Sequence, residues 1–236
     1  KVDTDYYTDA MTYTNVRVID SFDNSRTAGA IVEHGEVQVV RKVVGYKKIK
    51  FYTSENLGYG DVNLPEKDMH TTSYWFTMPR DRLRTLDFTP AEVIDGLSAL
   101  AYTLQHLSAM FLMADTHDID RSLGDKSGEW FVSQGKTGRV ITSFANGRPQ
   151  SASGPEGPRI DEFDPTIFIF DAYPGGIGFS ELLYREHANL LAAAKSLIAK
   201  CPCAFGCPSC VGPTLEVGKT AKEIVPQMID LVLGKG

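Results

Sequence analysis

Hydrophobic and polar residues alternate through the first third of the chain, which is also rich in Val, Ile, Tyr, Phe and Thr. A period of two predicts β-strands that have one buried face. Short turns at residues 23–25 and 34–35 and at Gly45 would join successive strands as hairpins, and residues 56–70 are expected to be a longer polar loop. We therefore predict an antiparallel meander over about residues 6–78. Its strands are expected at residues 12–22, 28–33, 37–44, 46–54 and 72–78.

A helical period replaces this alternation from residue 89 onwards. Thr89 and Glu92 form a capping-box sequence with proline at the first helical position, so a helix is predicted to begin there. A second long helix is predicted over residues 180–200, and its last turn leads directly into Cys201. Apolar residues at three- and four-residue intervals predict the buried face of the first helix, namely Val93, Leu97, Leu100, Leu104, Leu107 and Phe111.

Between these two helices the chain returns to strands. Short strands are predicted at residues 129–133 and 139–144, before a surface loop at 146–158 that is rich in Gly, Pro and Ser. The apolar run at 166–171 predicts a central strand that is buried on both faces. A glycine-rich turn at 173–178 then precedes a helix, as in phosphate-binding folds. It lacks a full G-x-G-x-x-G, and close packing of strand and helix explains its glycines more simply.

A final helix is predicted over residues 224–233. Thr220 and Glu223 form a second capping-box sequence, and Pro226 is expected to kink the helix or to delay its start. The chain is therefore predicted to have an α+β fold. An antiparallel β meander forms its N-terminal half, and long helices with a four-cysteine loop between the last two form its C-terminal half, over about residues 89–234.

All four cysteines lie within ten residues, in the spacing C-x-C-x3-C-x2-C. Four thiolates this close can form a closed tetrahedral zinc site, which has no open position and is therefore structural. Two disulfides would instead close very small, strained rings. An iron–sulfur cluster also takes four thiolates, although the C-x2-C-x2-C spacing of bacterial ferredoxins is absent. The predicted zinc ligands are Cys201, Cys203, Cys207 and Cys210.

Five basic residues fall within ten positions of the meander, with no acidic residue among them and with Tyr46, Phe51 and Tyr52 beside them. Basic residues interleaved with aromatic residues can hold a phosphate backbone and stack on bases. Lysines also protect exposed edge strands from aggregation, and the pattern favours this simpler role. The candidate nucleic-acid contacts are Arg41, Lys42, Lys47, Lys48 and Lys50.

Composition restricts the class of protein. The chain has 236 residues, 42% of them hydrophobic, and can bury a core. Its net charge of −6 argues against a surface that binds nucleic acid everywhere, but allows a local patch. No apolar run reaches the length of a membrane span and no secretion signal opens the chain, so a cytoplasmic location and no membrane partner are expected. Because the first residue is Lys1, we interpret the chain as part of a larger protein.

Two stretches imitate an ATP-binding phosphate loop, and both fail its spacing. Residues 135–137 have the terminal G-K-T, but Trp130 stands where the first glycine is required. Residues 212–220 have both ends of the motif with one residue too many between them. The chain by itself is therefore not expected to hydrolyse nucleotides.

Three segments together resemble the C-terminal zinc-binding domain of MrfA-like (YprA-like) helicases, which are superfamily 2 DNA repair helicases. These segments are residues 44–51, the turn at 171–179 with its P-G-G-x-G sequence, and the cysteine loop at 201–210 with the following V-G-P. The resemblance covers essentially the whole chain. It implies one accessory domain, residues 1–236, of an ATP-dependent helicase that moves 3′ to 5′ and repairs damaged DNA. It also implies that the four cysteines bind zinc, and that ATP and Mg²⁺ bind only in the motor domains.

Two hypotheses from different classes follow. In the first, zinc stabilises an accessory domain that contacts the helicase motor domains of the same polypeptide, and the basic strand residues guide single-stranded or forked DNA. In the second, the chain is a protein-interaction or scaffold module of a related system, such as anti-phage defence, with no DNA contact of its own. Charge reversal of Lys47, Lys48 and Lys50 distinguishes the two, because only the first predicts weaker binding to single strands.

Overall fold

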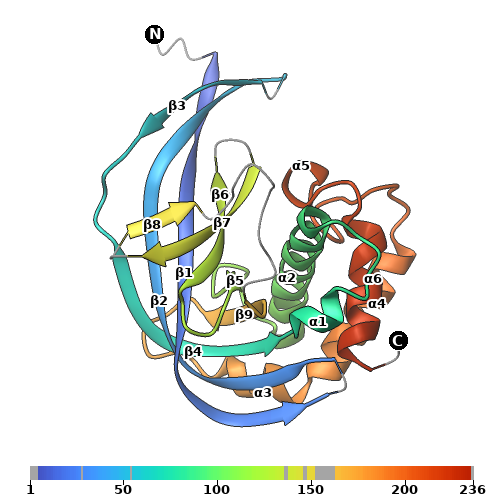
Figure 1. Ribbon diagram of the computed structural model, residues 1–236. Coiled ribbons are helices and arrows are strands. Elements are labelled where there is room, and N and C mark those ends of the chain that lie inside the picture. Colours follow the sequence, from blue (N-terminus) through green and yellow to red (C-terminus); the bar gives the residue numbers. More distant parts are fainter. Residues whose placement is uncertain are drawn as a thin grey trace.

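The computed structural model of the chain describes residues 5–27, 29–53, 55–135, 138–145, 148–151 and 163–234. In these residues a nine-stranded sheet has the order β1-β2-β4-β9-β5-β6-β7-β8, with β3 paired to β2 outside this order. Figure 1 shows the sheet curving around one side of a group of helices, which confirms the α+β fold. The elements are β1 (Tyr6–Arg26), β2 (Ile31–Lys50), β3 (Asn56–Asp61), β4 (Lys67–Thr77), α1 (Arg80–Leu83), α2 (Pro90–Leu112), β5 (Ile119–Gly124), β6 (Trp130–Gly135), β7 (Gly138–Ala145), β8 (Arg148–Ser151), β9 (Thr166–Asp171), α3 (Phe179–Arg185), α4 (His187–Lys200), α5 (Thr214–Val217) and α6 (Ala221–Val232).

The N-terminal half is an antiparallel β structure as predicted, but its predicted turns are wrong. Residues 23–25 lie inside β1, and residues 34–35 and Gly45 lie inside β2, so that β1 and β2 form one long ribbon. The glycines serve close packing instead of turning, because a Cβ at Gly35 would lie 2.1 Å from the carbonyl oxygen of Asp20. The polar segment 56–70 likewise contains β3 and the first residues of β4.

Strand β1 approaches β5 and β6, so that the first six strands in spatial order curl like a barrel. The Val18 N–H donates to the Lys126 carbonyl at 3.0 Å, and the Ser122 hydroxyl donates to the Thr14 carbonyl at 2.8 Å. These bonds join β1 to β5 and to the β5–β6 connection, although neither is a neighbour of β1 in the strand order. A cluster of buried side chains separate from the main core belongs to these strands: Val16, Val37, Val39, Trp75, Phe168 and Phe170.

The predicted central strand is confirmed as β9, whose six residues are all buried. It pairs with β4 on one side and β5 on the other. Ile167 and Ile169 belong to the main core with the helices, whereas Phe168 and Phe170 belong to the smaller core of the curled sheet. Because each face of β9 packs against an apolar core, hydrophobic and polar residues do not alternate along this strand.

Helix α2 begins at the predicted capping box, in which Thr89 and Glu92 exchange hydrogen bonds. Its predicted apolar face is buried at four positions, but Phe111 is 44% exposed near the helix end. The helix predicted at 180–200 is two helices, α3 and α4, separated at Glu186. The second capping box does not form, because Thr220 makes no side-chain cap. Helix α6 starts at Ala221 and contains Pro226, so the proline does not delay its start.

Strands β6 and β7 correspond to the two short strands predicted before the surface loop. Strand β8 occupies residues 148–151 of that loop, and residues 146–147 and 152–158 lie outside the described part of the chain. No helix in the described residues is long and apolar enough to cross a membrane.

Part of the ribbon projects beyond the rest of the molecule. Strand β4 pairs with β2 only as far as Arg41, and further along β2 pairs with β1 and β3. We call residues 5–10, 42–53 and 55–61 the β arm. Figure 1 shows the β arm rising past the helices, with β3 along its outer edge.

Candidate metal centre

The structure brings the four cysteine sulfurs together at the end of α4. Cys201 Sγ lies 3.5 Å from Cys203 Sγ and 3.6 Å from Cys207 Sγ, and Cys210 Sγ lies 3.5 and 3.6 Å from the same two atoms. All four sulfurs lie within 4.8 Å of one another. A tetrahedral ion with metal–sulfur bonds of about 2.3 Å places its ligands about 3.8 Å apart. The arrangement therefore fits one metal ion inside a set of four thiolates.

The same distances argue against the two competing chemistries. A disulfide bond is about 2.05 Å long, and the four cysteines are free in this structure. A cluster of four irons binds each thiolate to a different iron, which spreads the sulfurs over the outside of the cluster. The four cysteine sulfurs instead lie around a single point, as the ligands of one metal ion would.

Helices α2 and α6 hold the cysteine loop through its carbonyl groups. Lys222 Nζ, at the start of α6, donates to the carbonyl of Cys201 at 2.6 Å and also to that of Cys203. From α2, the Thr103 hydroxyl donates to the Cys210 carbonyl at 3.0 Å and the Tyr102 hydroxyl donates to the Pro208 carbonyl at 2.9 Å. The loop is thus fixed to two helices independently of any metal.

Sequence reasoning missed these supporting residues. Tyr102 and Thr103 precede their partners in the loop by 106 and 107 residues, and they lie on a helix whose pattern indicates only a buried face. No sequence signal links them to the loop, because the contact exists only once α2 packs beside it.

The loop backbone turns tightly at its second cysteine pair. The N–H groups of Cys210 and Gly212 both donate to the Cys207 carbonyl at 3.0 Å. Gly212 has a φ of +106°, and a Cβ there would lie 3.0 Å from Val217 and 3.3 Å from the Tyr102 ring. A larger residue would therefore be strained and would push the loop away from α2.

The thiols differ in their surroundings. A hydrogen bond from the Cys203 backbone N–H lowers the pKa of Cys201 to about 7. Burial raises the pKa of Cys210 to about 12, and this side of the loop faces the main core. Because thiolates are the metal-binding form, a metal that enters this site must displace the Cys210 proton.

The five predicted nucleic-acid contacts do not form one open basic surface. Arg41 pairs with Asp120, and Lys42 Nζ lies 3.2 Å from a carboxylate oxygen of Glu66. The other three lysines are on the β arm, and in the described structure none of them forms an ion pair. Lys48 Nζ lies 5.4 Å above the Tyr6 ring. The structure thus separates the set into two neutralised cations at the root of the β arm and three available ones, Lys47, Lys48 and Lys50.

Aromatic side chains accompany these three lysines. The rings of Tyr7 and Phe51 lie 5.5 Å apart, and those of Phe51 and Tyr52 lie 6.3 Å apart. All three are exposed, and Tyr52 is fully so. Tyr52 also has a φ of +69°, a left-handed conformation that non-glycine residues seldom adopt. The tip of the β arm therefore presents aromatic faces and ammonium groups together.

The glycine-rich turn serves packing, as its sequence indicates. The buried Asp171 carboxylate accepts the N–H groups of Ile177 and Gly178 at 2.7 and 3.1 Å, and the Thr72 hydroxyl at 2.9 Å. These amides would be the donors to a phosphate, but a carboxylate of the chain already occupies them and would repel a second anion.

Residues 100–211 match the family model of the MrfA zinc-binding domain. The match runs from the middle of α2 to the end of the cysteine loop and includes the whole four-sulfur set. This part of the chain is a MrfA-like zinc-binding domain. Similarity extends beyond it, because YprA of Bacillus subtilis, an uncharacterized ATP-dependent helicase, is 32% identical over 230 residues. These cover 98% of this chain and 26% of YprA.

Solved structures resemble the MrfA-like domain together with its β arm. A crystal structure of the DUF1998 helicase MrfA bound to DNA is 30% identical, with a TM-score of 0.62 over 98% of this chain and 26% of that one. Another MrfA crystal structure, 23% identical, has the same fold with a TM-score of 0.53, covering 93% of this chain and 24% of that one. An uncharacterized protein of Methanocaldococcus jannaschii is 42% identical over 48 residues, 20% of this chain and 43% of that protein. The chain spans about a quarter of the helicases that it matches.

Proposed function

We propose that the chain is a zinc-stabilised accessory domain, residues 1–236, of an ATP-dependent DNA helicase, and that its β arm contacts single-stranded DNA. Cys201, Cys203, Cys207 and Cys210 are the zinc ligands in this proposal. The observation that carries it is the compact four-sulfur set inside the segment that matches the MrfA zinc-binding domain. ATP and Mg²⁺ would bind in motor domains of the same polypeptide, outside these residues.

The role of the zinc is to fix the C-terminal helices. Cys201 caps α4, and the loop that follows leads through α5 into α6. With four thiolates the ion has no open coordination position, so it supplies no catalytic water. It holds the loop against α2 and α6, where Lys222, Thr103 and Tyr102 already bind the loop carbonyls.

The β arm supports a role in handling single strands. Exposed rings offer stacking surfaces worth about 1–3 kcal/mol per base, and lysines beside them attract the phosphate backbone. The three lysines and the three exposed rings all belong to the β arm. Figure 1 shows this arm rising past the helices. The relatives support the same assignment, because one was crystallised with DNA. Movement 3′ to 5′ and a function in DNA damage repair are the corresponding proposals for the whole helicase.

A charge-reversal experiment tests the β arm. Lys47→Glu and Lys50→Glu are combined, while Lys48 is kept because it lies over the Tyr6 ring. Affinity for a fluorescent oligothymidine is measured at several salt concentrations, with this chain and with the helicase that contains it. The double variant should bind more weakly, and the slope of log K against log salt should flatten by about 0.7 for each lost phosphate contact.

The matched control reverses two exposed lysines elsewhere, Lys200 and Lys219, and changes the net charge equally. The proposal requires this control to keep more affinity than the β-arm variant. Equal binding by both variants and the unchanged chain would refute the DNA contact. The alternative would then apply, in which the exposed β-arm residues, including Leu57 and Tyr59, dock a protein partner of a related system such as anti-phage defence.

Strand displacement by the helicase tests the remaining parts of the proposal. Forked substrates with a single 3′ or 5′ tail report the direction of movement, and survival of a deletion strain after DNA crosslinking reports repair. Unwinding only of the substrate with a 5′ tail would contradict movement 3′ to 5′. Unchanged survival of the deletion strain would contradict a function in DNA repair.

A further inference from the structure

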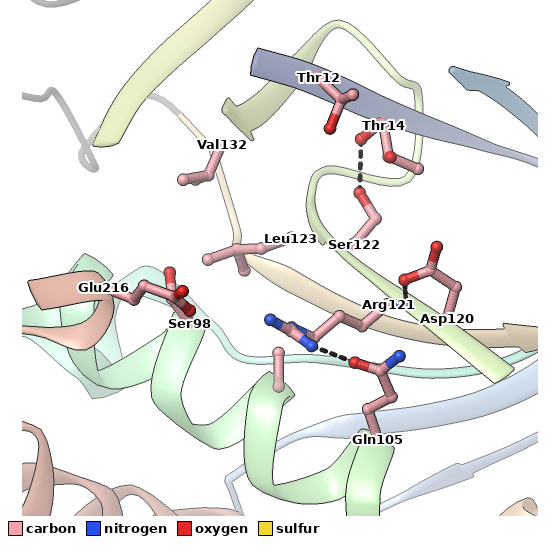
Figure 2. Close-up of a pocket in the computed structure, with 11 residues that line it drawn as sticks. Thr12, Thr14, Ser98, Gln105, Asp120, Arg121, Ser122, Leu123, Val132 and Glu216 are labelled. Carbon is pink, nitrogen blue, oxygen red and sulfur yellow. Dashed lines mark hydrogen bonds between the residues drawn. The ribbon is translucent and has the colours of Figure 1, made fainter. Parts of the chain in front are cut away.

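A polar cavity of about 260 Å³ lies between α2 and the sheet, apart from both the cysteine loop and the tip of the β arm. Figure 2 shows the Arg121 guanidinium extending into this space from β5, toward Ser98 and Glu216. Residues of five elements line the cavity, namely β1, α2, β5, β6 and α5. We propose that Arg121 binds a phosphate group in this cavity, and that a phosphodiester of a DNA strand is its source.

The guanidinium has unused donors. One N–H of Arg121 donates to the Gln105 side-chain oxygen, and the other four have no hydrogen-bond partner in the described structure. In the described structure no carboxylate oxygen lies within 4.0 Å of the Arg121 guanidinium nitrogens, so Arg121 forms no ion pair there. Burial lowers the pKa of Arg121, although the group stays charged at every physiological pH. A half-buried cation with free donors is a favourable partner for an oxyanion.

The two acids at the cavity do not neutralise Arg121 by contact. Asp120 pairs with Arg41 instead. Glu216, on α5, lines the cavity and is exposed, and its charge acts on Arg121 from beyond ion-pair distance. Glu216 should therefore weaken the binding of an anion without preventing it.

Neighbouring groups hold the guanidinium in place before any ligand arrives. Arg121 lies over the Tyr102 ring at 5.0 Å, and Gln105 is itself fixed because its amide donates to the Ile119 carbonyl at 2.8 Å. Hydroxyl groups add further polar lining. The Thr14 hydroxyl is one of them, and its oxygen accepts a hydrogen bond from Arg41 at 3.3 Å. Preorganised donors lose little entropy on binding.

Tyr102 also connects this cavity to the cysteine loop. Its hydroxyl donates to the Pro208 carbonyl at 2.9 Å, while its ring supports Arg121. The zinc loop would thus help to position a phosphate-binding arginine. Only the source of the phosphate rests on the proposed DNA function, because the cavity itself can be tested with inorganic phosphate.

The first experiment uses the unchanged chain and inorganic phosphate as the probe. The side-chain Nε–H resonance of Arg121 should shift progressively as phosphate is added in the millimolar range. The matched reference is Arg17, which is exposed on β1 and should not shift in the same way. An oligothymidine should shift Arg121 at lower concentration than phosphate does, if a DNA strand is the source. An unmoved Arg121 resonance in both titrations would overturn the proposal without requiring any variant to fold.

Variants then measure the contribution to affinity. Arg121→Gln should weaken phosphate binding by about tenfold or more, because hydrogen bonds to a charged group are lost. Arg17→Gln, with the same change of charge, should leave it unchanged, and Glu216→Gln should strengthen it. Equal affinities of the two arginine variants would refute the site. Substitution of Lys47 and Lys50 should not alter the response of Arg121 to inorganic phosphate. The phosphate site and the DNA contact of the β arm are therefore tested by different measurements, and either proposal can be refuted without the other.

Discussion

Replacing one cysteine tests whether the four thiolates act as a metal centre. Cys210 is the informative position, because it is only 2% exposed and its side chain belongs to the main core. Cys210→Ser keeps the shape of the side chain nearly unchanged but removes one thiolate from the set. Its backbone bond to Thr103 can persist, so the change acts mainly on the sulfur cluster.

The expected magnitude follows from the coupling of metal binding to folding. A structural zinc contributes about 10–16 kcal/mol in zinc-finger peptides, so one of four ligands accounts for roughly 3 kcal/mol. In a domain of this size each 1 kcal/mol lowers the melting temperature by about 2–4 °C. Cys210→Ser should therefore lower it by about 6–12 °C.

Thermal unfolding followed by circular dichroism, with elemental analysis of the same samples, measures both effects. The unchanged chain should contain one zinc ion per molecule, and the variant should retain less after dialysis against a chelator. Ser209→Ala is the matched control, since Ser209 is the exposed neighbour of Cys210 in the same loop. Equal melting temperatures and one zinc per chain in both variants would refute the metal centre.

Two further predictions concern buried polar groups. Burial lowers the pKa of His187 to about 4, so the unfolded chain, with a histidine pKa of about 6.5, binds the proton first. The contribution of neutral His187 is complete above pH 6.5 and is lost as the pH falls from 6.5 to 4, by about 2 kcal/mol at pH 5. Urea unfolding at pH 7.5 and pH 5 should therefore show that His187→Gln loses less free energy of unfolding between these pH values than the unchanged chain does. An equal loss in both proteins would contradict the prediction. Asp171→Asn should cost about 2 kcal/mol or more in the same assay, because the carboxylate accepts two backbone N–H bonds in the glycine-rich turn. The exposed control Glu181→Gln should cost less than about 0.5 kcal/mol, and similar costs for both would contradict the role of Asp171.

Features that depend on neighbouring residues were predictable from the sequence. The capping box of α2, the buried strand β9 and the four-cysteine loop each have a local signal, and the structure contains all three. One to three residues separate successive cysteines, so a single loop can bring their four sulfurs together. The sequence alone therefore predicts that these sulfurs lie close to one another. The resemblance to MrfA-like helicases likewise rests on short segments, namely residues 44–51, 171–179 and 201–213.

Only the tertiary structure shows the features that depend on contacts between residues far apart in the sequence. Gly35 has the sequence appearance of a turn residue, but packing against Asp20 makes it part of a long strand. The basic run appears uniform in the sequence, but Asp120 and Glu66 neutralise its first two members. The Arg121 cavity requires the curled sheet to meet α2. Sequence patterns report the period of burial along one element, whereas these contacts depend on how separate elements meet, and that is determined by the packing of the whole chain.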